Sequence, residues 1–228
     1  MSGFLGVGLY TVPEASRFTH VSIGRIRRWA RGYSFVPPGR ERRTSPPVWR
    51  LQFSEADRIV LTFRDLIEIR AVNAFLKAGV SWGTLRRSAQ SVVEIFGSTH
   101  PLSSQRFKTD GEKIFAELLR KDEAAALIEL ADRQYVFRRI VDEFLFGITF
   151  SKGEPVQWWP LGEKRAVVID PSRAFGQPIV ADGSVHTRIL AGAFAAEGSY
   201  DRVARWYGIP ARAVKDSVEY EKTLTRAA

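Results

Sequence analysis

Two helix-start signals separated by a tight turn lie within residues 11–31, and they restrict this part of the chain to a pair of short helices. Thr11 can cap a helix, and Glu14 three residues later completes a capping box that satisfies two backbone donors. Pro13 falls in the first turn, where its missing N–H is harmless. A short turn then leads to Ser22, a second N-cap. The sequence therefore predicts a helix–turn–helix.

The second helix of this pair has an apolar face and a basic face. Apolar residues recur at helical spacing and are expected to pack inward: Ile23, Ile26, Trp29 and Ala30. Ala15 and Phe18 give the first helix its apolar face, and Gly32 is a plausible terminator of the second. The side chains left facing outward are those of Ser22, Gly24, Arg25, Arg27, Arg28 and Arg31.

Positive charge is concentrated around this pattern. Residues 1–50 contain nine arginines, no lysine and two glutamates, a net charge of +7 out of +9 for the whole chain. A localised positive charge is the footprint of a protein that binds a polyanion. An arginine-rich helix face is often only solvated, but here it favours DNA, with Arg25 and Arg28 reaching base edges. The expected phosphate contacts are Ser22, Arg27 and Arg31.

A second basic segment follows between two proline pairs. Arg40, Arg42 and Arg43 lie between Pro37-Pro38-Gly39 and Pro46-Pro47, and the alternating residues 48–53 come next. This order is typical of a wing beside a recognition helix, whose arginines grip the sugar–phosphate backbone or the minor groove. The alternative is a disordered basic linker. We expect the wing, with residues 48–53 as a strand.

Related turn-and-cap patterns occur twice more. Residues 80–89 match residues 21–30 at six of ten positions without a gap, after a predicted helix over Leu61–Ala78 that Gly79 ends. Residues 208–215 are a weaker relative. Only the first copy has a strongly basic context, so DNA reading is assigned to it alone. Residues 51–100 are nearly neutral, which suits packing or dimerisation.

The middle of the chain predicts hairpins and a helix. Asp110-Gly111 within residues 107–115 is a hairpin signal, and residues 123–132 read as a helix. Residues 136–150 lead through a turn into residues 156–160, which favours a second hairpin. Trp158 and Trp159 would then lie on opposite faces, one in the core and one available to anchor a partner.

The last third predicts two short strands, within residues 165–171 and 175–187, followed by a helix over Thr187–Ala196. Its motifs include Val168-Ile169-Asp170-Pro171, Phe175-Gly176-Gln177-Pro178-Ile179-Val180, Glu197-Gly198-Ser199 and Ala204-Arg205-Trp206-Tyr207-Gly208. These motifs resemble a small antitoxin module of unknown function. With the N-terminal helix–turn–helix, which is also MerR-like, and Trp158-Trp159-Pro160-Leu161-Gly162, nearly the full chain resembles a VapB-type antitoxin of the two-domain kind.

The resemblance implies a homodimer that binds double-stranded DNA at its own promoter and represses its own operon. It also implies a protein partner, a PIN-type ribonuclease toxin that the antitoxin neutralises. One departure is the loop over residues 181–184, which has a single glycine where a glycine-rich loop is expected.

The expected fold class is mainly α with small β-hairpins (α+β). We expect a winged helix–turn–helix domain over residues 1–100, an α+β middle region over 101–162 and a small helical antitoxin-like domain with two short strands over 163–228. The absence of cysteine, of a signal peptide and of a membrane-length apolar run predicts a cytoplasmic protein without a membrane partner.

Enzymatic readings have little support in the sequence. His20, His100 and His186 lack metal-ligand spacing, and Asp170 before Pro171 is typical of a turn. We therefore expect no catalytic residues, metal or cofactor. Carboxylates that converge only in the folded chain leave a nuclease open as a distant possibility. The main alternative function is a MerR-like transcriptional regulator that responds to a small ligand bound in the middle or C-terminal region.

Overall fold

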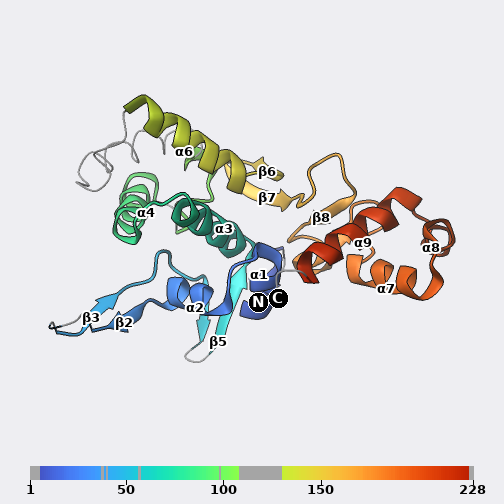
Figure 1. Ribbon diagram of the computed structural model, residues 1–228, viewed down its shortest axis with the longest axis horizontal. Helices are drawn as coiled ribbons and strands as arrows, with labels where there is room; N and C mark the ends of the chain where they lie inside the picture. The colour runs from blue at the N-terminus through green and yellow to red at the C-terminus, as the bar shows by residue number, and fades with distance from the viewer. Residues whose placement is uncertain are drawn as a thin grey trace. The chain divides into compact units, whose positions relative to one another are not determined.

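The computed structural model describes residues 6–36, 39, 41–55, 58–97, 99–107 and 130–225. They form a mixed α+β fold with small antiparallel sheets, which confirms the predicted class (Figure 1). The chain forms two compact units, one of residues 11–145 and one of residues 1–10 with 146–228. The expected boundaries at residues 100 and 162 stay predictions. No helix of the described ranges is long and apolar enough to span a membrane.

The unit of residues 11–145 is built around a central helix, α3, which contacts α1, α4, α6 and strand β5 (Figure 1). Its core includes Leu66, Ile69 and Phe75 of α3, and the Phe75 ring packs against the rings of Phe137 and Phe144 of α6. The elements of this unit are α1 (Val12–Thr19), α2 (Ile23–Arg31), β2 (Tyr33–Phe35), β3 (Arg43–Ser45), β4 (Phe53–Glu55), β5 (Arg58–Thr62), α3 (Phe63–Lys77), α4 (Trp82–Phe96) and α6 (Leu130–Phe144).

Helix α3 begins at Phe63 rather than at the predicted Leu61, because the chain is still a strand up to Thr62. Thr62 caps the helix in a capping box with Asp65, a signal that the sequence reading missed. The buried Asp65 also accepts hydrogen bonds from Trp49 Nε1 (2.6 Å) and His100 Nε2 (3.0 Å). One carboxylate therefore joins the start of α3 to two distant segments, and His100 has a structural role.

A second buried acid on α3 holds the segment after residue 100. Glu68 Oε1 accepts hydrogen bonds from the backbone N–H groups of Leu102 (2.9 Å) and Ser103 (3.0 Å). Burial raises the pKa of Glu68 to about 7, although the nearby His100 and the two backbone donors act in the opposite direction. Glu68 is thus a buried carboxyl group that titrates near neutral pH.

Two of the predicted elements in this unit differ from expectation. Residues 48–53 are not a continuous strand, because Val48 and Trp49 are neighbours and both are buried, which an alternating strand does not allow. Residues 136–144 belong to helix α6, not to a hairpin. The predicted hairpin at 107–115 lies outside the described residues except for Phe107. The predicted helix at 123–132 also lies outside them except for its last three residues, which begin α6.

The second unit contains an antiparallel sheet of order β6-β7-β8-β9 and three helices. The predicted second hairpin is present as β6–β7, and both predicted C-terminal strands and the helix after them are confirmed. Its elements are β1 (Leu9–Tyr10), β6 (Ile148–Ser151), β7 (Glu154–Trp158), β8 (Val167–Ile169), the 3₁₀ turn η2 (Ala174–Gly176), β9 (Pro178–Val180), α7 (Thr187–Glu197), α8 (Tyr200–Tyr207) and α9 (Ala211–Thr225).

Apolar side chains of β9 and all three helices form the core of this unit, among them Val180, Leu190, Val203 and Val214. Tyr10 brings the N-terminal segment into the same unit, because its hydroxyl donates to the carbonyl of Gly176 at 2.8 Å. An added Cβ at Gly176 would lie 2.2 Å from that hydroxyl oxygen, so the close approach requires glycine.

Candidate nucleic-acid interface

Helix α1 begins and ends as the sequence predicts. Thr11 Oγ1 accepts from Glu14 N–H (3.3 Å), and the Glu14 carboxylate accepts from Thr11 N–H (2.8 Å), which completes the capping box. Ala15 and Phe18 are buried. The helix ends at His20, a non-glycine residue with φ 56° and ψ 31°, and this left-handed conformation makes the tight turn toward α2.

Helix α2 packs its predicted apolar face inward, with one exception. Ile26, Trp29 and Ala30 are buried, but Ile23 is 37% exposed. Ile23 is the first helical residue and lies one turn before Ile26, so its side chain extends past the end of the core. The prediction that Ile23 packs inward is therefore wrong, and its side chain adds an apolar element to the exposed surface.

The predicted polar face of α2 is exposed in full. Two of its arginines are held by neighbouring aromatic rings: the Arg25 guanidinium lies 5.7 Å from the Trp29 ring centroid, and that of Arg28 lies 6.0 Å from the Tyr33 ring centroid. Arg28 Nε also donates to Gly24 O at 3.3 Å. These contacts position both arginines, whose side chains are exposed. The exposed members of this face are Ser22, Gly24, Arg25, Arg27, Arg28 and Arg31.

The segment at the start of α4, which resembles the start of α2 in sequence, differs from it in its side-chain hydrogen bonds. Ser22 and Ser81 are N-caps with nearly the same backbone angles, but only Ser81 accepts a bond from its own helix, from Thr84 N–H at 3.1 Å. Ser22 makes no side-chain cap hydrogen bond. Its hydroxyl group is therefore available to an external ligand, whereas that of Ser81 is used within the fold.

The arginines of the α4 segment are also used within the unit. Arg87 donates to Thr84 Oγ1 at 3.3 Å, and Arg86 lies 3.5 Å from Ser45 Oγ. The indole of Trp82 stacks on that of Trp29, with ring centroids 6.3 Å apart. This comparison supports assigning DNA reading to the first copy and a packing role to the second.

A wing follows α2, as a hairpin of β2 and β3 that extends from the helices of its unit (Figure 1). Gly32 ends α2 with φ 73°, and a Cβ there would lie 2.3 Å from Ser45 O, so this junction requires glycine. Arg42 and Arg43 are exposed near the tip. The third arginine predicted for the wing, Arg40, lies outside the described residues.

The two tryptophans predicted as partner contacts have different environments. Trp158 is only 5% exposed and belongs to the core beside β8, whereas Trp159 is half-buried and donates through Nε1 to Thr149 Oγ1 at 3.3 Å. Asp170 accepts from Ser172 N–H and from Gln157 Nε2, which confirms that Asp-Pro forms a turn. No group of three His, Asp or Glu side chains arranged to hold a metal occurs among the described residues.

Sequence reasoning missed one feature of the C-terminal unit. Phe175 is 77% exposed and has φ 54°, between Ala174 at 45° and Gly176 at 78°. Three consecutive left-handed residues are costly for a chain of L-amino acids, and such strain is often found at functional positions. The only sequence signal was the motif Phe-Gly-x-Pro, which does not reveal that the phenylalanine faces solvent.

Comparisons with known proteins agree with this geometry. Residues 8–88 match a family model described as "Putative DNA-binding HTH domain". The chain is 30% identical over 226 residues to "Putative antitoxin VapB45" of Mycobacterium tuberculosis (strain ATCC 25618 / H37Rv), with 93% of each chain covered. The crystal structure of Rv2018 from Mycobacterium tuberculosis has the same fold, with a TM-score of 0.67 at 24% identity over 94% of this chain and 99% of the other. The chain therefore belongs to the VapB-type antitoxin family and carries a DNA-binding helix–turn–helix domain at its N-terminal end.

Proposed function

We propose that this protein is the antitoxin of a type II toxin–antitoxin system, binds the DNA of its own promoter, represses its own operon and neutralises a PIN-type ribonuclease toxin. The observation that supports DNA binding is the fully exposed basic face of α2. At the N-terminus of this helix the Ser22 hydroxyl makes no capping hydrogen bond, and at its C-terminus the wing follows. The family membership supports the antitoxin part. In this role the protein is a cytoplasmic regulator and not an enzyme.

Arg25 and Arg28 are assigned to base edges in the major groove, where a guanidinium can bind guanine O6 and N7 with two hydrogen bonds. Ser22, Arg27 and Arg31 are assigned to phosphates, and Arg40, Arg42 and Arg43 to the backbone or minor groove beside them. The aromatic contacts of Arg25 and Arg28 support this division, because a side chain that is already oriented loses less entropy when it binds.

The DNA assignment is tested with duplexes from the region upstream of the protein's own gene. Arg25→Ala should weaken binding by about 1–3 kcal/mol and relax the preference at one base position. Arg87→Ala is the matched control, because Arg87 occupies the same place in the α4 copy as Arg28 in α2 but bonds to Thr84 within the fold. Equal affinity of wild type and Arg25→Ala for every duplex would contradict the assignment.

A homodimer with two-fold symmetry would read half-sites about one helical turn, or a multiple of it, apart. We place the dimer interface outside residues 1–50, because bringing two segments of charge +7 together is repulsive. Helix α4 offers the exposed apolar residues Val93 and Ile95 for this contact. Sedimentation analysis of Ile95→Asp tests it, and an unchanged dimer would place the interface elsewhere.

The proposed toxin contact lies in the C-terminal unit. Trp159 is the more accessible of the two predicted tryptophans, and Phe175 is the most exposed large apolar side chain among the described residues. Large exposed aromatic residues are typical anchors of protein interfaces. Expressing the adjacent gene alone should arrest growth, and co-expression of this protein should relieve the arrest. Phe175→Ser should weaken the relief without changing DNA binding.

A harmless neighbouring gene, or arrest that persists, would favour the second candidate, a MerR-like transcriptional regulator that responds to a small ligand. One structural observation favours a ligand-responsive regulator. A small polar cavity lies at the end of α1, directly before the turn into the reading helix.

A further inference from the structure

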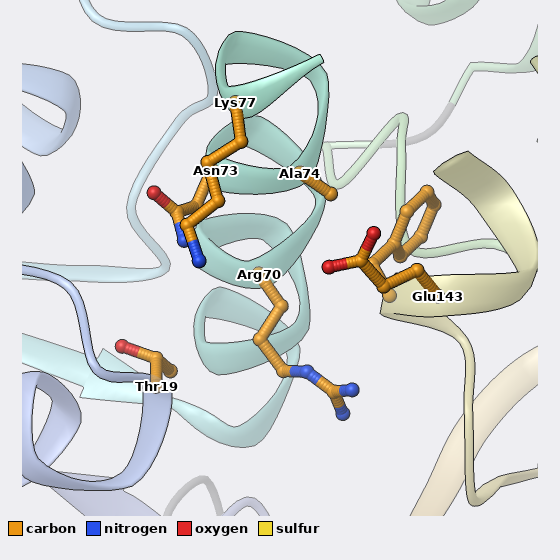
Figure 2. Close-up of a pocket in the computed structure, with 7 residues that line it drawn as sticks. Thr19, Arg70, Asn73, Ala74, Lys77 and Glu143 are labelled. Atoms are coloured by element: carbon orange, nitrogen blue, oxygen red, sulfur yellow. The ribbon is translucent and has the colours of Figure 1, made fainter. Parts of the chain in front are cut away.

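A cavity of about 110 Å³ lies between the end of α1, one face of α3 and the end of α6 (Figure 2). Helix α3 supplies Arg70, Asn73 and Lys77, which share one face because they are three and seven residues apart. Thr19 of α1 and Glu143 of α6 complete its polar lining. The cavity is thus polar on every element that borders it.

Among these residues, Asn73 says most about what the cavity can bind. It is only 7% exposed, yet its amide makes no hydrogen bond to any part of the chain that the structure describes. Figure 2 shows Asn73 and Lys77 on the side of α3 that faces Thr19. The amide therefore borders the cavity, where a ligand atom can be its partner.

Two of the three charged side chains that line the cavity are basic. Arg70 and Lys77 carry two positive charges, and His20 lies beside them at the turn. Burial lowers the pKa of His20, and the charges of Lys77 and Arg70 lower it further. Glu143, whose carboxylate extends from α6 toward α3 in Figure 2, is the one acidic side chain among the lining residues. An anion is therefore the favoured occupant.

The lining also contains hydrogen-bond acceptors, which restrict the kind of anion. Thr19 Oγ1 donates its hydrogen to Ala15 O at 2.6 Å, so toward the cavity the oxygen can only accept. The ionised Glu143 carboxylate also only accepts. A ligand that fits this lining carries negatively charged oxygens for Asn73 and Lys77, together with a hydrogen of its own for Thr19 or Glu143.

We propose that this cavity binds the oxyanion group of a small diffusible ligand that also carries a hydrogen-bond donor, such as a hydrogen phosphate. Lys77 and Arg70 neutralise its charge, the Asn73 amide donates to one of its oxygens, and Glu143 accepts its hydrogen. The ligand would join α1 to α3 and α6 three residues before the N-cap of α2. The site does not depend on the proposed DNA contacts.

Calorimetric titration of the full chain with inorganic phosphate at pH 7 tests the proposal, with sodium sulfate at equal ionic strength as the matched anion. Sulfate carries no hydrogen at this pH, so phosphate should bind at least tenfold more tightly. Lys77→Gln should raise the Kd for phosphate about tenfold, and because Lys77 is exposed the variant should remain folded. Asn73→Asp should abolish binding, and Arg139→Gln, on the exposed surface of α6, should bind as wild type.

Three results would overturn the proposal. Phosphate binding of equal strength in wild type and Lys77→Gln would show a non-specific ionic effect. Equal binding of sulfate would show that no ligand hydrogen is recognised. Loss of phosphate binding when the promoter duplex is present, together with a smaller salt dependence of DNA binding in Lys77→Gln, would identify the oxyanion as a DNA phosphate. Because phosphate is titrated without DNA, a failure here leaves the Arg25→Ala test of DNA binding unaffected.

Discussion

Gly24 lies in the first turn of α2, where no contact within the protein explains a glycine. A Cβ at this position would meet no atom within 4 Å, and its φ is not in the left-handed region. Glycine destabilises a helix by about 0.5–1 kcal/mol relative to alanine, so its presence is unfavourable for folding. An absent side chain does allow a phosphate or base edge to approach the backbone N–H groups closely. Gly24 is therefore understandable as part of a binding surface.

Gly24→Ala should raise the free energy of unfolding by about 0.5–1 kcal/mol and weaken DNA binding about tenfold, the equivalent of about 1.4 kcal/mol. Gly83→Ala is the matched control in the α4 copy, where a Cβ would make only ordinary contacts. It should stabilise the protein similarly and leave DNA binding unchanged. Chemical denaturation and fluorescence anisotropy measure the two quantities, and equal DNA affinity of both variants would contradict a DNA contact at Gly24.

Glu68 should make stability depend on pH. Its pKa is raised from 4.5 to about 7 in the folded state, so the folded protein holds this proton more tightly than the unfolded chain. The resulting stabilisation is complete below about pH 4.5 and is lost as the pH rises through 7, by roughly 3 kcal/mol in all. Glu68→Gln should remove this loss, and its stability should exceed that of wild type most at pH 8.

Urea denaturation between pH 5 and pH 8 measures this difference. Glu94→Gln, which changes an exposed glutamate on α4, should follow the wild-type profile. Parallel profiles for wild type and Glu68→Gln would mean that Glu68 is ionised in the folded protein across the whole range.

The sequence predicted which side chains of α2 are exposed but not their hydrogen-bond partners. The spacing of Ile26, Trp29 and Ala30 fixed which side of α2 is exposed, because a helix has one regular period. Ser22 and Ser81 have similar backbone angles, but only the Ser81 side chain caps its own helix, and the sequence pattern does not distinguish the two. Asn73 and Glu68 are buried polar residues of α3, and their environments come from segments distant in sequence.

Among the elements, the wing differs most from its sequence description. The sequence placed the strand of the wing after Pro46-Pro47, whereas both strands of the hairpin precede this pair. Each proline lacks a backbone donor, which interrupts strand pairing, and Trp29 O instead accepts from Val48 N–H at 3.1 Å. Hairpin β6–β7 and strands β8 and β9 were predictable because their alternation and turn residues are local signals.

The wing should bind DNA without regard to sequence. Arg42→Ala should weaken binding to all duplexes equally and reduce the slope of log affinity against log salt by about one. Arg139→Ala, an exposed arginine on α6 outside the proposed interface, is the control. Anisotropy titrations at several salt concentrations measure the slope. A loss confined to one base position would make Arg42 a base-reading residue instead.

At the scale of the whole molecule, the chain passes between its two units twice, after Tyr10 and after Leu145. The unit of residues 11–145 is thus inserted within the other. The sequence did not predict this arrangement, because the hydrogen bond between Tyr10 and Gly176 joins residues 166 positions apart and no local sequence pattern indicates it. The predicted division at residues 100 and 162 followed composition and motif boundaries, which carry no information on such contacts.

Tyr10→Phe should selectively destabilise the unit formed by residues 1–10 and 146–228. The change removes one buried hydrogen bond to Gly176 O, worth about 1 kcal/mol, without altering the ring. Hydrogen exchange of the β8 and β9 amides should become roughly fivefold faster, while that of α3 should not change. Tyr207→Phe, at an exposed tyrosine, is the control. Uniform acceleration in both units would mean that they unfold as one.

Because residues 11–145 are inserted in the sequence of the other unit, the two units can fold at different times during synthesis. Residues 11–145 leave the ribosome before any residue of the sheet β6-β7-β8-β9, so the unit that carries α2 and the wing can fold first. At about 5–20 residues per second, the remaining residues require on the order of ten seconds. During that time Tyr10 has no Gly176 to bind, and the nascent protein holds a complete DNA-reading unit before its proposed toxin-binding surface exists.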